Sequence, residues 1–340
     1  RDCLLSRGLG DVYKRQIEDY KILCRDYTVS LDNLQRVWEA KLEPVFPCRI
    51  KTTDTTPETY SNANRIQRSA SIKVAQPRVL IPVFPGTNCE YDTARAFERA
   101  GAKAETIVIR NLSASAIEES VNVFERAIKQ SQIIMLPGGF SGGDEPEGSG
   151  KFITAFFRNA KIKDAVHDLL QNRDGLMLGI CNGFQALVKL GLVPFGEIID
   201  MADDAPTLTF NTIARHQSMM VTTRIASNKS PWLYGCEVGD IHTIPISHGE
   251  GRFVAPDRII QQMANNGQIA TQYVDLDGNP TMDIRYNPNT SVEAIEGITS
   301  PDGRVLGKMG HSERIGSFVG KNVPGSKDQK IFESGVAYFK

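Results

Sequence analysis

The sequence predicts an α/β protein with a mostly parallel central sheet, helices on both faces of that sheet and a β-rich second half. Between residues 78 and 190, short apolar runs alternate with stretches whose apolar residues recur at helical spacing. Continuous apolar strands joined by helices are typical of parallel sheets that are buried on both faces. Beyond Gly191 the apolar segments are shorter and are separated by turn residues, which favours strands.

Charge and composition exclude several classes of protein. The 340 residues include 39 Lys and Arg against 40 Asp and Glu, so nothing indicates a nucleic acid or a membrane surface as partner. No apolar run reaches the length of a membrane span, and the first residues do not resemble a signal peptide. The six cysteines contain no C-x-x-C pair, which argues against a metal site and against a disulfide framework. We therefore expect a cytoplasmic protein without a metal.

The first 77 residues are expected to lie outside the main domain. Residues 1–16 have no periodicity and no starting Met, so we interpret them as a non-native or disordered start. The missing Met also suggests the C-terminal piece of a longer chain. Residues 17–50 hold one helical pattern that ends before Pro44, and we expect them to be the tail of an upstream region. Residues 51–77 are rich in polar residues and predict a linker, which leaves 78–340 as the main domain.

The strands and helices of the main domain follow from its apolar patterns. Strands are predicted at 79–84, 104–109 and 132–136, and a fourth begins at Leu176 and leads into Cys181. Helices are predicted before Gly101, after the candidate caps Ser113 and Ser115, at 151–159, at 162–171 and from Ala186. Later strands are predicted at 208–211, 219–225, 241–247, 269–274, 294–299 and 305–309, the last two joined by a Pro-Asp-Gly turn.

Residues 179–185 read Gly-Ile-Cys-Asn-Gly-Phe-Gln between a buried strand and a helix, which is the layout of a nucleophile elbow. Gly179 and Gly183 suit such a turn because side chains there would collide with neighbouring backbone. Cys181 would lie at the start of a helix, where unpaired N–H groups favour the thiolate. Taken alone, the motif fits a buried structural cysteine about equally well, since free cysteines are often buried.

A glycine-rich loop, 137–144, follows the third strand of the main domain. The carboxyl ends of parallel strands meet at one edge of a sheet, so this loop is expected beside Cys181. Backbone N–H groups at Gly139 and Phe140, after Gly138, and at Asn182 are placed to stabilise an oxyanion. A tight turn is the simpler interpretation of the two glycines when they are considered alone.

Two segments pair a histidine with a glutamate two residues later: His248 with Glu250, and His311 with Glu313. In an extended segment residues i and i+2 point the same way, so each glutamate can orient its histidine as a base for the cysteine. Spacing does not choose between the two pairs.

Together these motifs resemble the class I (triad) glutamine amidotransferases, which have a flavodoxin-like architecture. The segments 85–90 (PGTNCE), 248–252 (HGEGR) and 310–314 (GHSER) more closely resemble the glutaminase domains of the phosphoribosylformylglycinamidine synthases, over about residues 78–320. The resemblance implies that Cys181 is the nucleophile, His311 the general base and Glu313 the residue that orients it. It also implies a contact between Gln185 and the substrate glutamine. The chain departs from this family at Ser312, where proline is usual.

The resemblance implies further that glutamine is hydrolysed to glutamate and ammonia, and that the ammonia passes to a synthetase half. That half, which uses ATP and Mg²⁺, would convert formylglycinamide ribonucleotide to its amidine in purine biosynthesis; this chain would need no cofactor. The alternatives are a cysteine peptidase-like hydrolase and a non-catalytic regulatory domain. A peptidase of similar fold predicts a histidine soon after the elbow, but none lies between Cys181 and His216.

Overall fold

The computed structural model describes residues 19–50, 55–65, 69–140 and 150–340, and the chain divides into two units, Arg1–Ile50 and Lys51–Lys340. The predicted non-native start, 1–16, lies outside the described residues. No helix in the described part of the chain is long and apolar enough to cross a membrane. The five cysteines that the structure describes are all free thiols.

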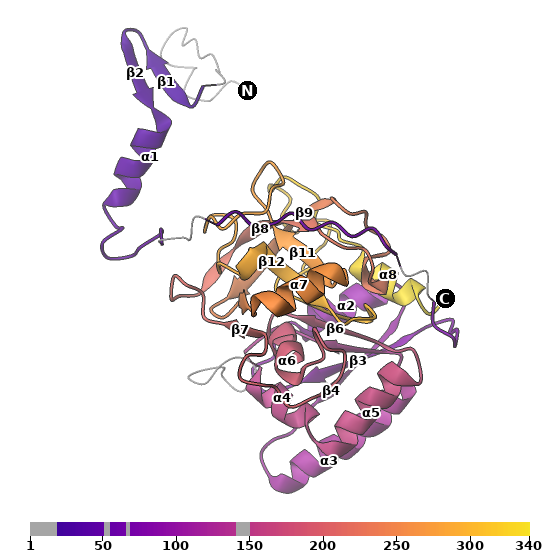
Figure 1. Cartoon of the computed structure of the whole chain (residues 1–340). Coiled ribbons are helices and arrows are strands. Elements are labelled where there is room, and N and C mark those ends of the chain that lie inside the picture. Colours follow the sequence, from indigo (N-terminus) through magenta and orange to yellow (C-terminus); the bar gives the residue numbers. More distant parts are fainter. Residues whose placement is uncertain (1–18, 51–54, 66–68, 141–149) are drawn as a thin grey trace. The chain divides into compact units, whose positions relative to one another are not determined.

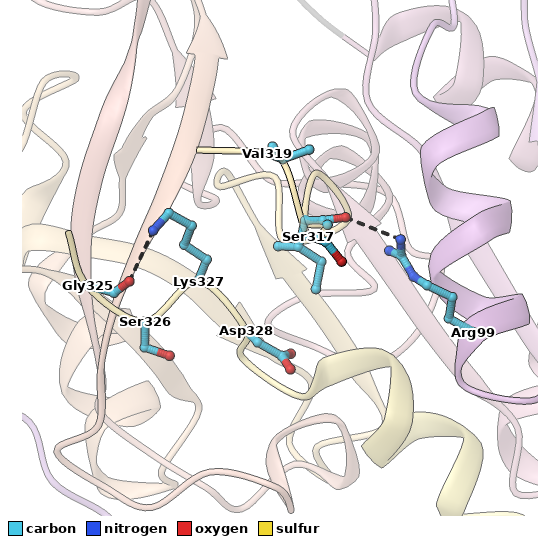
Figure 2. A pocket seen from close by; sticks show the side chains of 9 residues that line it. Arg99, Ser317, Val319, Gly325, Ser326, Lys327 and Asp328 are labelled. Carbon is cyan, nitrogen blue, oxygen red and sulfur yellow. Dashed lines mark hydrogen bonds between the residues drawn. The ribbon is translucent and has the colours of Figure 1, made fainter. Parts of the chain in front are cut away.

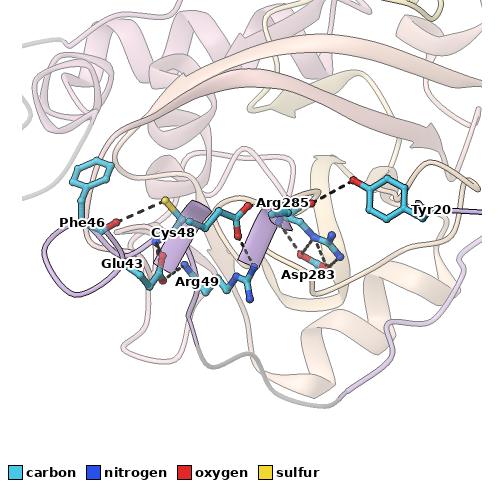
Figure 3. Close-up of polar contacts among 9 residues, drawn as sticks. Tyr20, Glu43, Phe46, Cys48, Arg49, Asp283 and Arg285 are labelled. Atoms are coloured by element: carbon cyan, nitrogen blue, oxygen red, sulfur yellow. Dashed lines mark hydrogen bonds and ion pairs between the residues drawn. The ribbon is translucent and has the colours of Figure 1, made fainter. Parts of the chain in front are cut away.

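The first unit is a small hairpin followed by one helix. Strands β1 (Lys21–Cys24) and β2 (Tyr27–Ser30) pair antiparallel, and α1 (Leu31–Ala40) follows at once. The Ser30 hydroxyl caps α1 by accepting a hydrogen bond from the N–H of Asn33. After α1, the Glu43 carboxylate accepts the backbone N–H groups of Cys48 and Arg49, which lowers the pKa of Glu43 (Figure 3). The helix agrees with its apolar pattern, whereas the hairpin was not predicted.

One sheet forms the centre of the second unit, and among the described residues its strand order is β4-β3-β5-β6-β13-β12-β11-β8-β9 (Figure 1). The strands from β4 to β13 pair in parallel, and those from β13 to β9 pair antiparallel. This arrangement confirms the predicted α/β class and its β-rich second half. The strands are β3 (Arg78–Val83), β4 (Lys103–Val108), β5 (Ile133–Leu136), β6 (Leu176–Ile180), β8 (Gln217–Ile225), β9 (Ile241–His248), β11 (Ile269–Tyr273), β12 (Ile295–Thr299) and β13 (Val305–Lys308); β7 (Thr207–Thr209) pairs with β10 (Arg252–Val254) apart from them.

Helices cover both faces of this sheet, which explains why successive residues of β5 and β6 are all buried. One group joins α2 to α8 through the edge-to-face rings of Phe97 and Phe332, 5.0 Å apart. The other group is held by a phenylalanine cluster in which Phe124 contacts Phe156 and Phe157 edge-to-face. The helices are α2 (Glu90–Arg99), α3 (Ala114–Gln130), α4 (Lys151–Phe157), α5 (Ala160–Gln171), α6 (Asn182–Leu190), α7 (Asp257–Asn265) and α8 (Ile331–Ala337), with short 3-10 turns η3 (Pro231–Leu233) and η4 (Val292–Ala294).

Each strand and helix predicted between 78 and 190 is present within a few residues, and Ser113 caps α3 as expected. Helices α7 and α8 and strand β10 were not predicted. The apolar residues of α7 do recur at helical spacing, but it is short and lies among strands. Further upstream, the described part of 51–77 forms no helix or strand and bonds to the rest of the second unit: Asn62 donates to the Ala226 carbonyl and Val74 to that of Phe339.

Candidate active site

The predicted elbow is present at the end of β6, and its backbone is strained. Cys181 has φ 53° and ψ −107°, a left-handed conformation that residues other than glycine rarely adopt. Its N–H donates to the Lys308 carbonyl on β13 (2.9 Å), and its carbonyl accepts from Gln185 in α6 (3.0 Å). Gly183 has to be glycine, because a Cβ there would lie 2.0 Å from the backbone oxygen of Leu136. The thiol is therefore held at the edge of the sheet by both adjoining strands and by α6.

The glycine-rich loop brings three reactive side chains together around Gly138. A Cβ built on Gly138 would lie 2.7 Å from Cε1 of His311, 3.1 Å from Sγ of Cys89 and 3.4 Å from Cβ of Cys181. Only a glycine lets the loop pass this close. The structure thus places Gly138 beside Cys181, as the parallel sheet predicted, and it also places His311 there.

His311 and Glu313 form a buried hydrogen-bonded pair, with 2.6 Å between Nδ1 and Oε1. The other predicted pair does not form: both ring nitrogens of His248 are buried without a hydrogen-bond partner among the described residues. His311 Nε2 is also without such a partner and is the ring nitrogen left for proton transfer. The geometry therefore distinguishes two pairs that spacing left equivalent.

The two histidines have opposite electrostatic surroundings. Burial alone would lower the pKa of His311, but the Glu313 carboxylate and the thiols of Cys181 and Cys89 raise it well above 6.5. Burial opposes ionisation of Glu313 as well, yet its pKa is lowered by His311. Burial, together with the charges of His311 and His216, lowers the pKa of His248 to about 3. His311 is thus suited to carry a proton near neutral pH, and His248 is neutral there.

One predicted donor is already used within the protein. The N–H of Phe140, expected to stabilise an oxyanion, donates to the Gly86 carbonyl at 2.8 Å. The prediction for Phe140 is therefore wrong: its N–H belongs to an isolated antiparallel bridge that pairs Thr87 with Gly139. Gly139 has a φ of 144°, and a Cβ there would lie 2.7 Å from the Gly86 oxygen. The rest of the predicted loop, 141–144, lies outside the described residues.

Asn182 and Gln185 join the elbow to a second loop. The Asn182 side-chain amide donates to Oε1 of Gln185 at 2.9 Å, and the Gln185 amide in turn donates to the Glu250 carbonyl. The Cys181 thiol points to the same region, since it lies 3.7 Å from the Ser247 carbonyl. The backbone of residues 247–250 therefore borders the elbow, which gives a structural role to the His-Gly-Glu motif.

Sequence reasoning gave no role to Cys89 and Arg314. The Cys89 thiol lies 3.9 Å from Nδ1 of His311, and Arg314 donates to it at 3.1 Å. Both residues lie in the segments 85–90 and 310–314, which carry the family resemblance, and this position is the signal that could have found them. Among the described residues, Cys89, His311 and Glu313 are the group whose ligand atoms, all within 4.8 Å of one another, could hold a metal ion. The hydrogen bond between His311 and Glu313 already uses two of these atoms.

A separate surface pocket begins two residues after Glu313. It has a volume of about 440 Å³ and lies between the end of α2 and the loop 315–328 (Figure 2). Arg99 donates to the Ile315 carbonyl across it, and Lys327 donates to the Gly325 carbonyl. None of the predicted site residues lines this pocket, so it is distinct from the cysteine site.

The fold and this cluster define a class of protein, an α/β enzyme with a cysteine elbow beside a histidine–glutamate pair. The chain belongs to the family of CobB/CobQ-like glutamine amidotransferase domains, whose model matches residues 76–339.

Similar proteins include the phosphoribosylformylglycinamidine synthase subunit PurQ of Methanococcus maripaludis strain C7. It is 38% identical over 247 residues, which are 72% of this chain and 84% of that subunit. The PurQ subunit of Aquifex aeolicus is 32% identical over 246 residues, covering 72% of this chain and 92% of that one. A chain in the structure of PurLQS from Thermotoga maritima matches 78% of this chain and 100% of its own length, with 26% identity and a TM-score of 0.56.

The two histidines should affect stability with opposite dependence on pH. A raised folded pKa at His311 stabilises the protein below about pH 6.5, and this contribution is lost as the pH rises through the folded pKa. The lowered pKa of His248 makes stability fall as the pH drops from 6.5 towards about 3. Each slope should approach ~1.4 kcal/mol per pH unit.

The measurement is urea unfolding of the parent, His311→Asn and His248→Asn proteins between about pH 5 and 9. The stability gap between parent and His311→Asn should narrow with rising pH. In the His248→Asn protein, the free energy of unfolding should instead fall less steeply as the pH drops below 6.5. A gap for His311→Asn that widens with pH contradicts the charge assignment.

Proposed function

We propose that this chain is the glutaminase part of a phosphoribosylformylglycinamidine synthase, with Cys181 as nucleophile, His311 as base and Glu313 as the group that orients His311. The observation that carries the proposal is the 2.6 Å bond between His311 Nδ1 and Glu313, beside the strained Cys181 elbow. A base held by a carboxylate beside a cysteine thiol at a strand end is the arrangement that acyl transfer needs. The names of the PurQ relatives support the specific reaction.

The chemistry proceeds through a thioester. His311 takes the thiol proton of Cys181 at Nε2. The resulting thiolate attacks the side-chain carbonyl carbon of glutamine, forming a carbon–sulfur bond and moving the carbonyl electron pair onto oxygen. Two backbone N–H groups stabilise that oxyanion: that of Gly139 in the glycine-rich loop and that of Asn182 at the start of α6. Collapse of the tetrahedral intermediate breaks the carbon–nitrogen bond as Nε2 of protonated His311 gives its proton to the amide nitrogen, which leaves as ammonia. The neutral ring then takes a proton from water, whose hydroxide cleaves the thioester and releases glutamate.

The loop around Glu250 is proposed to bind the substrate side of this site. Gln185 already bonds to the Glu250 carbonyl, so substrate binding at the elbow and at this loop is coupled. Gly138 keeps room for the substrate because any side chain there would overlap His311. The ammonia passes to a synthetase half, where ATP and Mg²⁺ would be used; this chain supplies the nucleophile and base and needs no cofactor.

The first test labels the nucleophile. Incubation with a glutamine-like diazoketone should add one label per chain, and peptide mass spectrometry should locate it at Cys181. Cys181→Ala should remove the label. Cys89→Ala is the matched control, since that thiol also contacts the His311 region. A label that stays in the Cys181→Ala protein refutes the nucleophile assignment.

The second test separates the two histidines. His311→Ala should lower kcat for glutamine hydrolysis by roughly 10²–10⁴, the usual contribution of a positioned acid or base. His248→Ala should have a milder effect, because its ring nitrogens have no partner in the described structure. The assay is glutamate release with both proteins matched in folded fraction. If His248→Ala is inactive and His311→Ala still turns over, the base has been placed on the wrong residue.

The third test addresses the synthetase partner. Mixing the chain with the synthetase half, ATP, Mg²⁺ and formylglycinamide ribonucleotide should raise glutamine hydrolysis and make amidine nitrogen from glutamine. Coupled amidotransferase sites are completed by closure of the loaded partner, which is the reason for this stimulation. Nitrogen-15 labelled glutamine shows the transfer by mass. Unchanged hydrolysis and unlabelled amidine would contradict the proposed reaction.

A further inference from the structure

Lys308 is a fully buried lysine at the junction of the two halves of the sheet. It is the last residue of β13, and its side chain is 1% exposed. In the parallel pairing of β13 with β6 it lies opposite Ile180, and its carbonyl accepts the N–H of Cys181 at 2.9 Å. The main chain of Lys308 thus holds the nucleophile's own backbone.

The side chain of Lys308 bonds to both residues that flank His311. Its ammonium donates to the Gly310 carbonyl at 2.9 Å and to the Ser312 hydroxyl at 3.1 Å. Glu296, which is 0% exposed, lies 3.2 Å from the ammonium and accepts the N–H of Gly310 at 2.6 Å. The segment that carries the base is therefore tied down on each side of the imidazole by one buried ion pair.

The Ser312 hydroxyl both accepts and donates a hydrogen bond. It accepts from Lys308 and donates to Oε1 of Gln329 at 2.5 Å. The amide of Gln329 donates in turn to the Thr223 hydroxyl on β8 at 3.3 Å. Proline, which is usual here in the family that the sequence resembles, would stiffen the backbone directly. With serine, the same segment is held by side-chain bonds to a buried lysine and a buried glutamine.

We propose that Lys308 is a positioning residue, which holds the His311 imidazole in place relative to the Cys181 thiol. This inference rests on the proposed roles of those two residues. One lysine fixes the elbow through its carbonyl and the base segment through its ammonium, so a shift of either side chain requires the buried network to move. Buried ion pairs add little net stability compared with apolar replacements, so the main contribution of this one is to geometry. Displacement by an ångström can cost about a hundredfold in rate.

The test uses Ser312→Ala, which removes one end of the network and leaves both charges paired. We expect kcat for glutamine hydrolysis to fall about tenfold or more with KM nearly unchanged, since Ser312 does not contact the substrate in the proposed mechanism. The kcat–pH profile should move as His311 loses its fixed contact with Glu313. Ser312→Pro should recover part of kcat by stiffening the backbone.

Ser227→Ala is the matched control. Ser227 is 2% exposed, and its hydroxyl donates to the Gly267 carbonyl at 2.8 Å in another part of the fold. It should lower the melting temperature as much as Ser312→Ala does but leave kcat and its pH profile unchanged. Equal kcat values for Ser312→Ala and Ser227→Ala overturn the inference.

A second variant keeps the inference testable if Ser312→Ala folds poorly. Lys308→Met combined with Glu296→Gln removes both buried charges together, so neither is left unpaired. It should fold and show the same selective fall in kcat. If this variant keeps full kcat while His311→Ala is inactive, Lys308 has no positioning role but the proposed base stands. If His311→Ala keeps full kcat, the proposed base is itself wrong, and the role of Lys308 is overturned with it.

Discussion

The left-handed backbone of Cys181 is the constraint on which the rest of the site depends. A residue with a Cβ stays in this conformation only where its surroundings leave no alternative. Here β6 ends against β13 on one side, and α6 begins so close to β5 that Gly183 has no room for a methyl group. The sheet and the helix therefore pack tightly around a turn that neither would adopt alone. The result is a thiol presented at the edge of the sheet at the start of a helix.

The two buried histidines near this thiol differ in their hydrogen-bond partners, and this difference decides which of them can transfer protons. His311 has a carboxylate partner on one ring nitrogen and no partner on the other among the described residues, which is the state of a group prepared to transfer protons. His248 is equally buried, but its low pKa keeps it neutral. A neutral ring beside the pair adds bulk without adding a competing positive charge.

Sequence patterns predicted the sheet, the elbow and the meeting of two loops at one edge, because buried strands and Gly-rich turns leave clear local signals. Patterns of this kind did not choose between His248 and His311, since both have a glutamate two residues on. The sequence patterns also did not show that the Phe140 N–H donates to the Gly86 carbonyl, or that Lys308 donates to both neighbours of His311. Each of these depends on contacts between residues far apart in the chain, which no local pattern records. The hairpin before α1 was missed because short strands carry a weak pattern, and helix α7 because it is short and lies among strands.

The insertion of β13 between β6 and β12 has a consequence for biosynthesis. A ribosome releases β6 and the elbow long before it releases β13, so the nascent chain carries its cysteine for some time without the strand that fixes it. Until β13 enters the sheet, the Cys181 N–H has no Lys308 carbonyl to bind and the histidine segment is still being made. On the proposed assignment, unfinished chains therefore do not hydrolyse glutamine. Ammonia is first made when translation of this region is nearly complete.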